Sequence, residues 1–341
     1  MKIKNLNIFI LFFLFLNIVQ TVEAKIELVN YRSWDYCYKI SNADAEIIIN
    51  PAYGGHILYY GLKTLNTNAL WTDSTINGYT FEKHQGSIAG RKTPDSGRFD
   101  IGNERLTYNI HGALWEGVYR VRIVNDYSVV VTSYPSKESG IQLSRKYTLD
   151  NEGSHLIVKQ TMENISSSGV RYCHWSRTLL PSGGVYITPF VKTLKYPKGF
   201  AQFLWSPDRM DKENPSTERV SIVNDTIFVA RPDGDGGVKY GMMTTLGWCF
   251  YVNNNMMFVK RFDLYPNGEY DNNLKAEFPN MIYFDKRFIE IEPNSAMVKL
   301  KPGESNSYTE NWWLLYYQKK TDNTFDVMEA ITFAKENALH K

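Results

Sequence analysis

The stretch IQLSRKYTLDNEGSHLIVKQTMEN (residues 141–164) carries the clearest signal for the fold. It predicts two strands joined by a turn at residues 150–153, where Asp, Asn, Glu and Gly follow one another. In the second strand Leu156 and Val158 face one way, and Lys159 faces the other. Such alternation is typical of an antiparallel pair with one buried and one solvated face. We therefore expect this hairpin inside an antiparallel sheet.

The same kind of pattern recurs along most of the chain. Residues 121–135 (VRIVNDYSVVVTSYP) predict a hairpin that turns at Asn125-Asp126. No alternation of strands with helices appears, which argues against a parallel, doubly wound sheet. The pattern favours an all-β fold. Further segments of this type are TIFVARP, WCFYVNNNMMFVKRF, RFIEIEP and SYTENWWLLYYQ.

One segment has a helical pattern instead. Apolar residues recur at three-residue spacing in 325–339, beginning with Phe325 and Met328, and predict a short C-terminal helix packed on the sheets. Two polar segments rich in Gly and Pro, 205–219 and 231–239, are flanked directly by strand patterns, so we interpret them as long loops rather than domain boundaries. Residues 25–341 are expected to form a single domain.

The first residues have a different role. Lys2 and Lys4 precede an apolar run at residues 8–16, and Val22-Glu23-Ala24 supplies a signal-peptidase site. Residues 1–24 therefore predict a cleavable signal peptide and a secreted or periplasmic protein. The apolar run is too short to span a bilayer as a helix, so no membrane attachment is expected after cleavage.

The net charge, the cysteines and the aromatic content bear on which kinds of ligand or partner can be expected. A formal net charge of +2 gives no electrostatic reason to expect a nucleic-acid partner. The three cysteines, Cys37, Cys173 and Cys249, have no metal-ligand spacing and cannot all pair within one chain, and whether two of them pair is left open. Aromatic residues make up 14% of the chain, with 23 Tyr and 8 Trp. Aromatic rings suit stacking on sugars, but they equally fill the cores of β-sandwiches.

Several motifs, in order, resemble the aldose 1-epimerase (galactose mutarotase) family. They are INPAYGGHILYYGL at 49–62, GSIAGR at 86–91, GRFDIGNERLTY followed by His111-Gly112, HWSRTL from His174, and IEIEPNSAMVKLKPGESNSYTENWWLL near the end. The resemblance spans most of residues 26–318. It implies a large antiparallel β-supersandwich of the galactose mutarotase-like type, with a sugar or oligosaccharide as ligand.

The chain also departs from the pattern of that family. Members carry His-Gly-Gly where this sequence has His111-Gly112-Ala113. They also carry an Asn after the aromatic that follows the second histidine, where this sequence has His174-Trp175-Ser176-Arg177. The resemblance is therefore to a secreted branch of the superfamily rather than to the housekeeping epimerase. Fold transfers more safely than activity across such differences.

The resemblance implies specific roles. Glu292 would be the base that takes the anomeric proton, His174 the acid that protonates the ring oxygen, and His111 a hydrogen-bond partner of the ring oxygen or a neighbouring hydroxyl. Neither a metal nor another cofactor is expected. The residues expected to bind the substrate are Arg91 and Arg98, which would orient hydroxyls, the stacking aromatics Trp115, Tyr172 and Trp248, and Glu310.

Each of these residues also has a plain structural alternative. Glu292 could be an exposed strand residue, His174 a core histidine, and His111 part of an ordinary turn, while Arg91 and Arg98 could be solvated or paired with nearby aspartates. Two other functions therefore stay open. One is a non-catalytic carbohydrate-binding protein, and the other is a polysaccharide hydrolase or lyase using paired carboxylates such as Glu292 and Glu310. The identity of the sugar and the oligomeric state are not predicted.

Overall fold

The described part of the chain consists mostly of antiparallel strands, as expected for the all-β class. The structure, a computed structural model, describes residues 25–80, 95–102, 112–203, 210–211, 219–232, 234–270, 278–318 and 325–340. The described strands form two large sheets, and every strand pairing in them is antiparallel. The predicted signal peptide lies outside the described residues. Within the described residues no helix combines the length and the apolar character needed to cross a membrane.

The twelve-stranded sheet contains the long strand β10 at its centre, and β10 pairs with β5, β20 and β21. Its strand order is β1-β2-β3-β4-β5-β10-β20-β19-β16-β12-β13, with β21 beside this path. The strands are β1 (Lys25–Tyr31), β2 (Trp34–Ser41), β3 (Ala45–Asn50), β4 (His56–Leu62), β5 (Gly97–Gly102), β10 (Val170–Pro181), β12 (Phe200–Phe203), β13 (Met210–Asp211), β16 (Val238–Met242), β19 (Asn280–Phe284), β20 (Phe288–Pro293) and β21 (Val298–Leu300).

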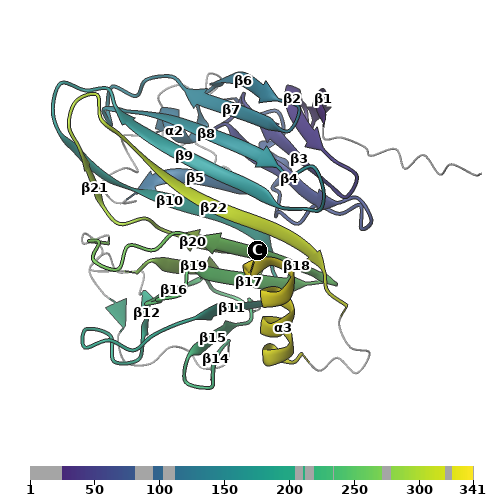
Figure 1. The fold of residues 1–341 in the computed structure, drawn as a ribbon, viewed down its shortest axis with the longest axis vertical. Helices are drawn as coiled ribbons and strands as arrows, with labels where there is room; N and C mark the ends of the chain where they lie inside the picture. Colours follow the sequence, from purple (N-terminus) through teal and green to yellow (C-terminus); the bar gives the residue numbers. More distant parts are fainter. Residues whose placement is uncertain are drawn as a thin grey trace, which may run out of the picture.

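The ten-stranded sheet has the order β14-β15-β11-β17-β18-β22-β9-β8-β7-β6. Figure 1 shows β22 crossing the middle of the molecule beside β9. The strands are β6 (Tyr119–Asn125), β7 (Ser128–Ser133), β8 (Ile141–Leu149), β9 (Leu156–Asn164), β11 (Val185–Pro189), β14 (Val220–Val223), β15 (Ile227–Ala230), β17 (Trp248–Asn253), β18 (Met256–Phe262) and β22 (Ser305–Tyr316).

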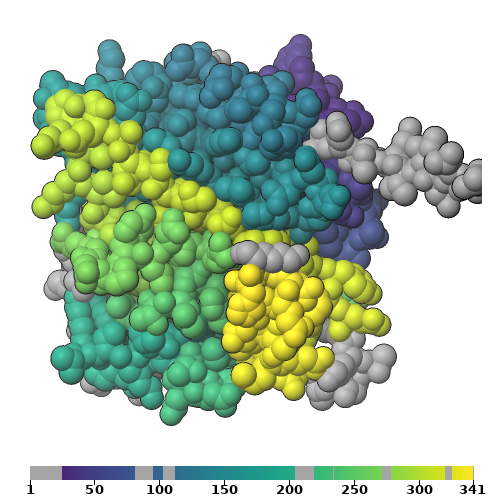
Figure 2. All heavy atoms as spheres, viewed as in Figure 1, coloured from purple at the N-terminus to yellow at the C-terminus, as the bar shows by residue number. Residues whose placement is uncertain are grey.

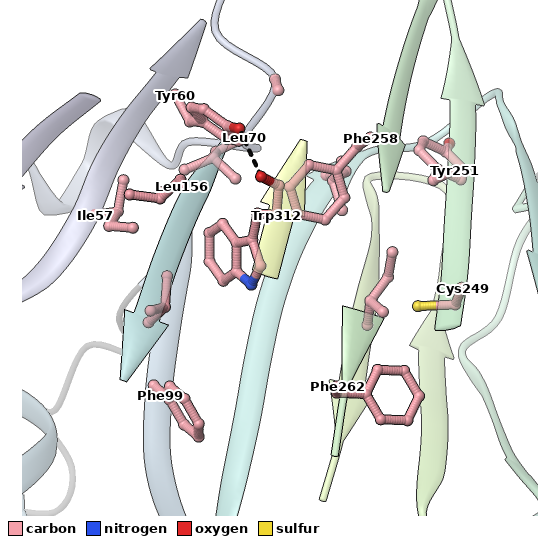
Figure 3. Packing of buried hydrophobic residues seen from close by; sticks show 14 of the residues in the cluster. Ile57, Tyr60, Leu70, Phe99, Leu156, Cys249, Tyr251, Phe258, Phe262 and Trp312 are labelled. Atoms are coloured by element: carbon pink, nitrogen blue, oxygen red, sulfur yellow. Dashed lines mark hydrogen bonds between the residues drawn. The ribbon is translucent and has the colours of Figure 1, made fainter. Parts of the chain in front are cut away.

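The main hydrophobic core lies between the two sheets. In the hairpin β8–β9 the buried and partly exposed positions alternate, as the sequence predicted, and the apolar set joins this core. Figure 3 shows aromatic side chains from both sheets meeting there, with Phe99 on β5 and Trp312 and Phe258 on β22 and β18. The hydroxyl of Tyr60 donates to the carbonyl oxygen of Trp312 at 3.3 Å and ties the sheets together.

A second core lies under the C-terminal helix α3 (Val327–Ala334), which continues as a π-helical turn at Lys335–Leu339. Its buried residues Ala330, Ile331 and Ala334 pack with the outer face of the ten-stranded sheet. The predicted helix at 325–339 is therefore confirmed. Figure 2 shows it on the surface of the molecule.

The connections match the expected loops where they are described. The connection from β15 to β16 falls within residues 231–237, all described except 233, and β16 begins inside the expected segment 231–239. Most of 205–219 lies outside the described residues. The three cysteines are buried, and none of them forms a disulfide. Two short helices, η1 (Ser74–Ile76) and α2 (Gly112–Glu116), lie in other loops.

Candidate functional site

The twelve-stranded sheet has one face in the main core and one outer face that turns away from the ten-stranded sheet. A group of buried charged and aromatic side chains lies on this outer face, on strands near the middle of the sheet and on α2. We call this group the charged band. It consists of Arg98 and Asp100 from β5, Trp175 and Arg177 from β10, Glu290 and Glu292 from β20, Lys239 from β16, and Trp115 from α2.

Strand alternation explains why these side chains share one face. Successive side chains of a strand point to opposite sides of the sheet, so residues two apart point to the same side. Arg177 is directly opposite Arg98, and Trp175 is opposite Asp100. Leu179, the next outward residue of β10, is opposite Glu290. Both glutamates of RFIEIEP therefore face outward, while the isoleucines between them enter the core.

Ion pairs hold the arginines of the charged band in place. Nε of Arg177 donates to Oε1 of Glu290 at 2.5 Å, and Nη2 of Arg98 lies 2.8 Å from Oδ2 of Asp100. All four residues are at least nine-tenths buried. Charges buried to this degree require such partners, because desolvation would otherwise make them very costly.

Trp115 covers the two arginines. The guanidinium groups of Arg98 and Arg177 lie 5.0 and 5.5 Å from its ring centroid, within the range of cation–π attraction. The backbone of Trp115 passes close to Gly54, which has a φ of 69°; a Cβ at this position would lie 2.2 Å from the carbonyl oxygen of Trp115. Only glycine permits this approach, so the Gly-Gly signature of the early strand positions α2 over the sheet.

Glu292 is the carboxylate of the charged band that has one oxygen bound and one oxygen without a partner in the described structure. It is fully buried, and its Oε2 accepts from Nε1 of Trp175 at 2.8 Å and from Nζ of Lys239 at 2.9 Å. Within the described part of the chain, its Oε1 has no hydrogen-bond partner. Because buried polar atoms are nearly always paired in folded proteins, an unpaired carboxylate oxygen points to a ligand or a catalytic role.

The two glutamates differ in acidity although they are two residues apart. Burial raises the pKa of Glu292 above its ordinary value; the charge of Lys239 opposes this, and that of Glu290 adds to it. Burial acts on Glu290 too, but the charges of Arg177 and Arg98 hold its pKa below the ordinary value. Paired carboxylates whose environments separate their pKa values are a recurring feature of acid–base sites.

The structure does not bring His174 and Glu292 together. His174 alternates with Trp175 on β10, so its imidazole points into the main core. There it is fully buried, lying 3.1 Å from Nε2 of Gln160 through Nδ1 and 3.3 Å from Oδ1 of Asn306 through Nε2. Burial lowers the pKa of His174 to about 3, which keeps it neutral. His174 therefore has the surroundings of a core histidine, which the sequence left open as the alternative to a catalytic acid.

Glu310 also lies in the main core rather than in the charged band. Its Oε2 is 3.0 Å from Nζ of Lys260, and both side chains are fully buried. Ser176, which alternates with Trp175 on β10, donates to the same oxygen at 3.1 Å. Glu310 and Glu292 are therefore on opposite sides of the twelve-stranded sheet, and they do not form the carboxylate pair expected for a hydrolase.

The other residues expected to bind the substrate lie partly in the charged band and partly in the hydrophobic cores. Arg98 and Trp115 belong to the charged band. Tyr172 packs against the main core and donates its hydroxyl hydrogen to the carbonyl of Ser139, and Trp248 is buried in the core under α3. Arg91 and His111 lie outside the described residues.

Several members of the charged band were not expected from the sequence. Glu290, Arg177 and Lys239 each contact another member, and Trp175 binds Glu292 directly. The available signal was the spacing of polar residues in apolar strands: Arg177 falls two residues after Trp175, and Glu290 two before Glu292. The contact of Lys239 with Glu292 crosses β19 and required the strand order.

Comparisons with known proteins identify the fold. No family model matches the chain, and no curated protein matches it significantly in sequence. Among solved structures, a galactose mutarotase-like protein from Lactobacillus casei is 14% identical with a TM-score of 0.53, covering 82% of this chain and 100% of its own. A galactose mutarotase related enzyme from Lactobacillus acidophilus is 12% identical with a TM-score of 0.51, covering 85% and 100%.

A third similar structure is a TPR-domain containing protein from Parabacteroides distasonis, 14% identical with a TM-score of 0.57. The match covers 89% of this chain but 56% of that protein. At such low identities the likeness concerns the fold. The expected architecture is confirmed: this chain has the galactose mutarotase-like fold, a large antiparallel β-supersandwich.

Proposed function

We propose that the charged band binds a sugar and that Glu292 acts there as the base of an aldose 1-epimerase type of reaction. The observation that carries the proposal is the state of Glu292: fully buried, with a raised pKa, one oxygen held by Trp175 and Lys239, and the other without a partner in the described structure. The names of the mutarotase-like structures above support a sugar as the ligand.

The chemistry needs one proton acceptor and one proton donor. The base removes the proton of the anomeric hydroxyl, the donor protonates the ring oxygen, and the bond between the anomeric carbon and the ring oxygen breaks to give the open-chain aldehyde. Rotation of the carbonyl and reversal of the same steps give the other anomer. A carboxylate whose pKa is raised towards neutrality is a better base than an ordinary glutamate.

We assign the donor role to Lys239. None of the histidines in the described ranges is hydrogen-bonded to Glu292, whereas Nζ of Lys239 lies 2.9 Å from its Oε2. Lys239 also lies 5.6 Å from the ring centroid of Trp175, which helps to fix its direction. Arg177 and Arg98 would bind hydroxyl groups and keep Glu290 ionised. The export predicted by residues 1–24 would place the sugar outside the cytoplasm.

Exchange NMR between α and β anomers tests this proposal. Rates are measured for neutral aldoses with wild-type protein, Glu292→Gln and Lys239→Met, against the uncatalysed rate. We expect Glu292→Gln to lose at least about a hundredfold of the acceleration, the usual contribution of a general base. Glu163→Gln, an exposed glutamate on β9, is the matched control and should be as fast as wild type.

His174→Gln separates this account from one based on the sequence motif. Because His174 is in the main core, this variant should keep its rate per folded molecule, although it loses stability. Full activity of Glu292→Gln would refute the assignment of the base. Loss of activity in a folded His174→Gln protein would refute the assignment of Lys239 as the donor.

A second candidate is a carbohydrate-binding protein without catalysis. The observation that favours it is the burial of His174, which removes the histidine acid expected from the motifs. Calorimetry distinguishes the two functions: this candidate predicts saturable sugar binding that Arg177→Ala weakens, together with anomer exchange no faster than in buffer.

A further inference from the structure

A cavity of about 600 Å³ lies at one end of the sandwich and shares no residue with the charged band. Its wall comes from the residues that follow β11, β16 and β18 and from Pro279, which precedes β19, so both sheets contribute. Its volume is within the range of small-molecule sites. The described lining is Val191, Thr193, Met243, Thr244, Thr245, Leu264, Tyr265, Pro266, Gly268, Glu269, Tyr270 and Pro279.

The wall combines aromatic rings with neutral hydroxyl groups. Tyr265 and Tyr270 supply the rings, and three threonines supply hydroxyls. Among the described lining residues only Glu269 is charged, and its Oε2 lies 2.5 Å from Nη2 of Arg171. The carboxylate is thus balanced by a cation of the protein itself. A neutral ligand with apolar faces and hydroxyl edges fits this wall better than an ion.

One buried polar atom close to the cavity wall strengthens the case for a polar ligand. The hydroxyl of Tyr308 has no hydrogen-bond partner among the described residues, and the side chain is fully buried. The ring of Tyr308 stacks on that of Tyr265, which lines the cavity, with centroids 6.3 Å apart. Unpaired polar groups of this kind call for a partner.

We propose that this end cavity is a binding pocket for a neutral disaccharide. The rings of Tyr265 and Tyr270 pack on the apolar faces of the sugar, and the threonine hydroxyls bond its edges. The ring of Tyr270 is fixed because its hydroxyl accepts from the backbone N–H of Tyr265 at 3.0 Å. The proposal goes beyond the proposed function and does not depend on the role of Glu292.

Calorimetric titration with maltose, cellobiose and lactose tests the pocket, with glucosamine and glucuronic acid as charged probes. Thr245→Trp places a bulky side chain at the cavity from an exposed position, so folding should be preserved. The matched control is Leu246→Trp, at the neighbouring exposed residue that does not line the cavity. We expect Thr245→Trp to weaken the binding of a neutral disaccharide at least about tenfold and Leu246→Trp to leave it unchanged.

The result separates this pocket from the charged band. Binding that Glu292→Gln and Arg177→Ala leave intact, and that Thr245→Trp removes, supports the pocket. Equal affinity in Thr245→Trp and Leu246→Trp, stronger binding of either charged probe, or no binding of any neutral disaccharide overturns it. Loss of binding only in Arg177→Ala would assign the sugar to the charged band, and the pocket would again be refuted.

Discussion

Breaking the ion pair between Lys260 and Glu310 should be among the most destabilising single changes in this protein. Both side chains are fully buried between the sheets, with Nζ and Oε2 3.0 Å apart. In Lys260→Met the carboxylate would keep its bonds from Ser176 and Trp312 but lose its cation. Removing one partner of a buried pair costs about 3–5 kcal/mol, so we expect a loss of this size in the free energy of unfolding.

Urea denaturation followed by tryptophan fluorescence measures this loss. The double variant Lys260→Met/Glu310→Gln removes both charges, and its amide can still accept from Trp312, so it should be more stable than the single Lys260→Met variant. Lys159→Met, at an exposed position of β9, is the control and should change the free energy of unfolding by less than about 0.5 kcal/mol. A loss below about 1 kcal/mol for Lys260→Met, or a double variant less stable than the single one, would refute the reasoning.

Three further predictions concern other parts of the fold. Asp326→Ala removes the carboxylate that accepts from the backbone N–H groups of Met328 and Glu329 at the start of α3, and should cost about 1 kcal/mol in urea denaturation; an unchanged midpoint would contradict this cap. The thiols should resist iodoacetamide in the native protein because all three are buried, with burial raising the pKa of Cys37 to about 11 and that of Cys249 to about 12; mass spectrometry should show labelling only after denaturation, and rapid native labelling would be inconsistent with this packing. Finally, the unfolded chain binds a proton at His174 below its ordinary pKa of 6.5 and the folded chain only near 3, so the free energy of unfolding should fall as the pH is lowered between these values; His174→Gln should show a smaller fall between pH of about 7 and about 4.5, and an equal fall would mean that this histidine is not buried in its neutral form.

The architecture could be predicted because it depends on local patterns. Alternation in residues 141–164 and the repeated strand-and-turn pattern fix antiparallel pairs, and the ordered motifs indicate the particular sandwich. The C-terminal helix was equally visible in the spacing from Phe325 to Ile331. These features depend on residues that are close in sequence, so they can be predicted without knowledge of the strand order.

The site could be predicted only in part, because it depends on which face each residue occupies. His174 and Trp175 are adjacent, and a one-residue difference in register exchanges the core and outer faces of a strand. The motif pointed to His174, but the strand turns Trp175 towards Glu292. Lys239 reaches Glu292 across β19, a neighbour relation set by the strand order of the whole sheet. Arg98, Trp115 and Glu292 all lie in the charged band, and the roles that the motifs imply for them stay predictions.

The most direct test of the central claim follows the indole N–H signals of the tryptophans in a ¹H–¹⁵N NMR spectrum during sugar titration. Trp175 donates its indole N–H to Glu292, and Trp115 covers Arg98 and Arg177, so both report on the charged band. Trp175→Phe and Trp115→Phe assign their signals, and Trp248, in the core under α3, serves as the internal reference. A sugar that accelerates anomer exchange should shift the signals of Trp175 and Trp115 saturably and leave that of Trp248 in place. Saturable binding of such a sugar without any change at Trp175 and Trp115 would contradict a sugar site on the outer face of the twelve-stranded sheet.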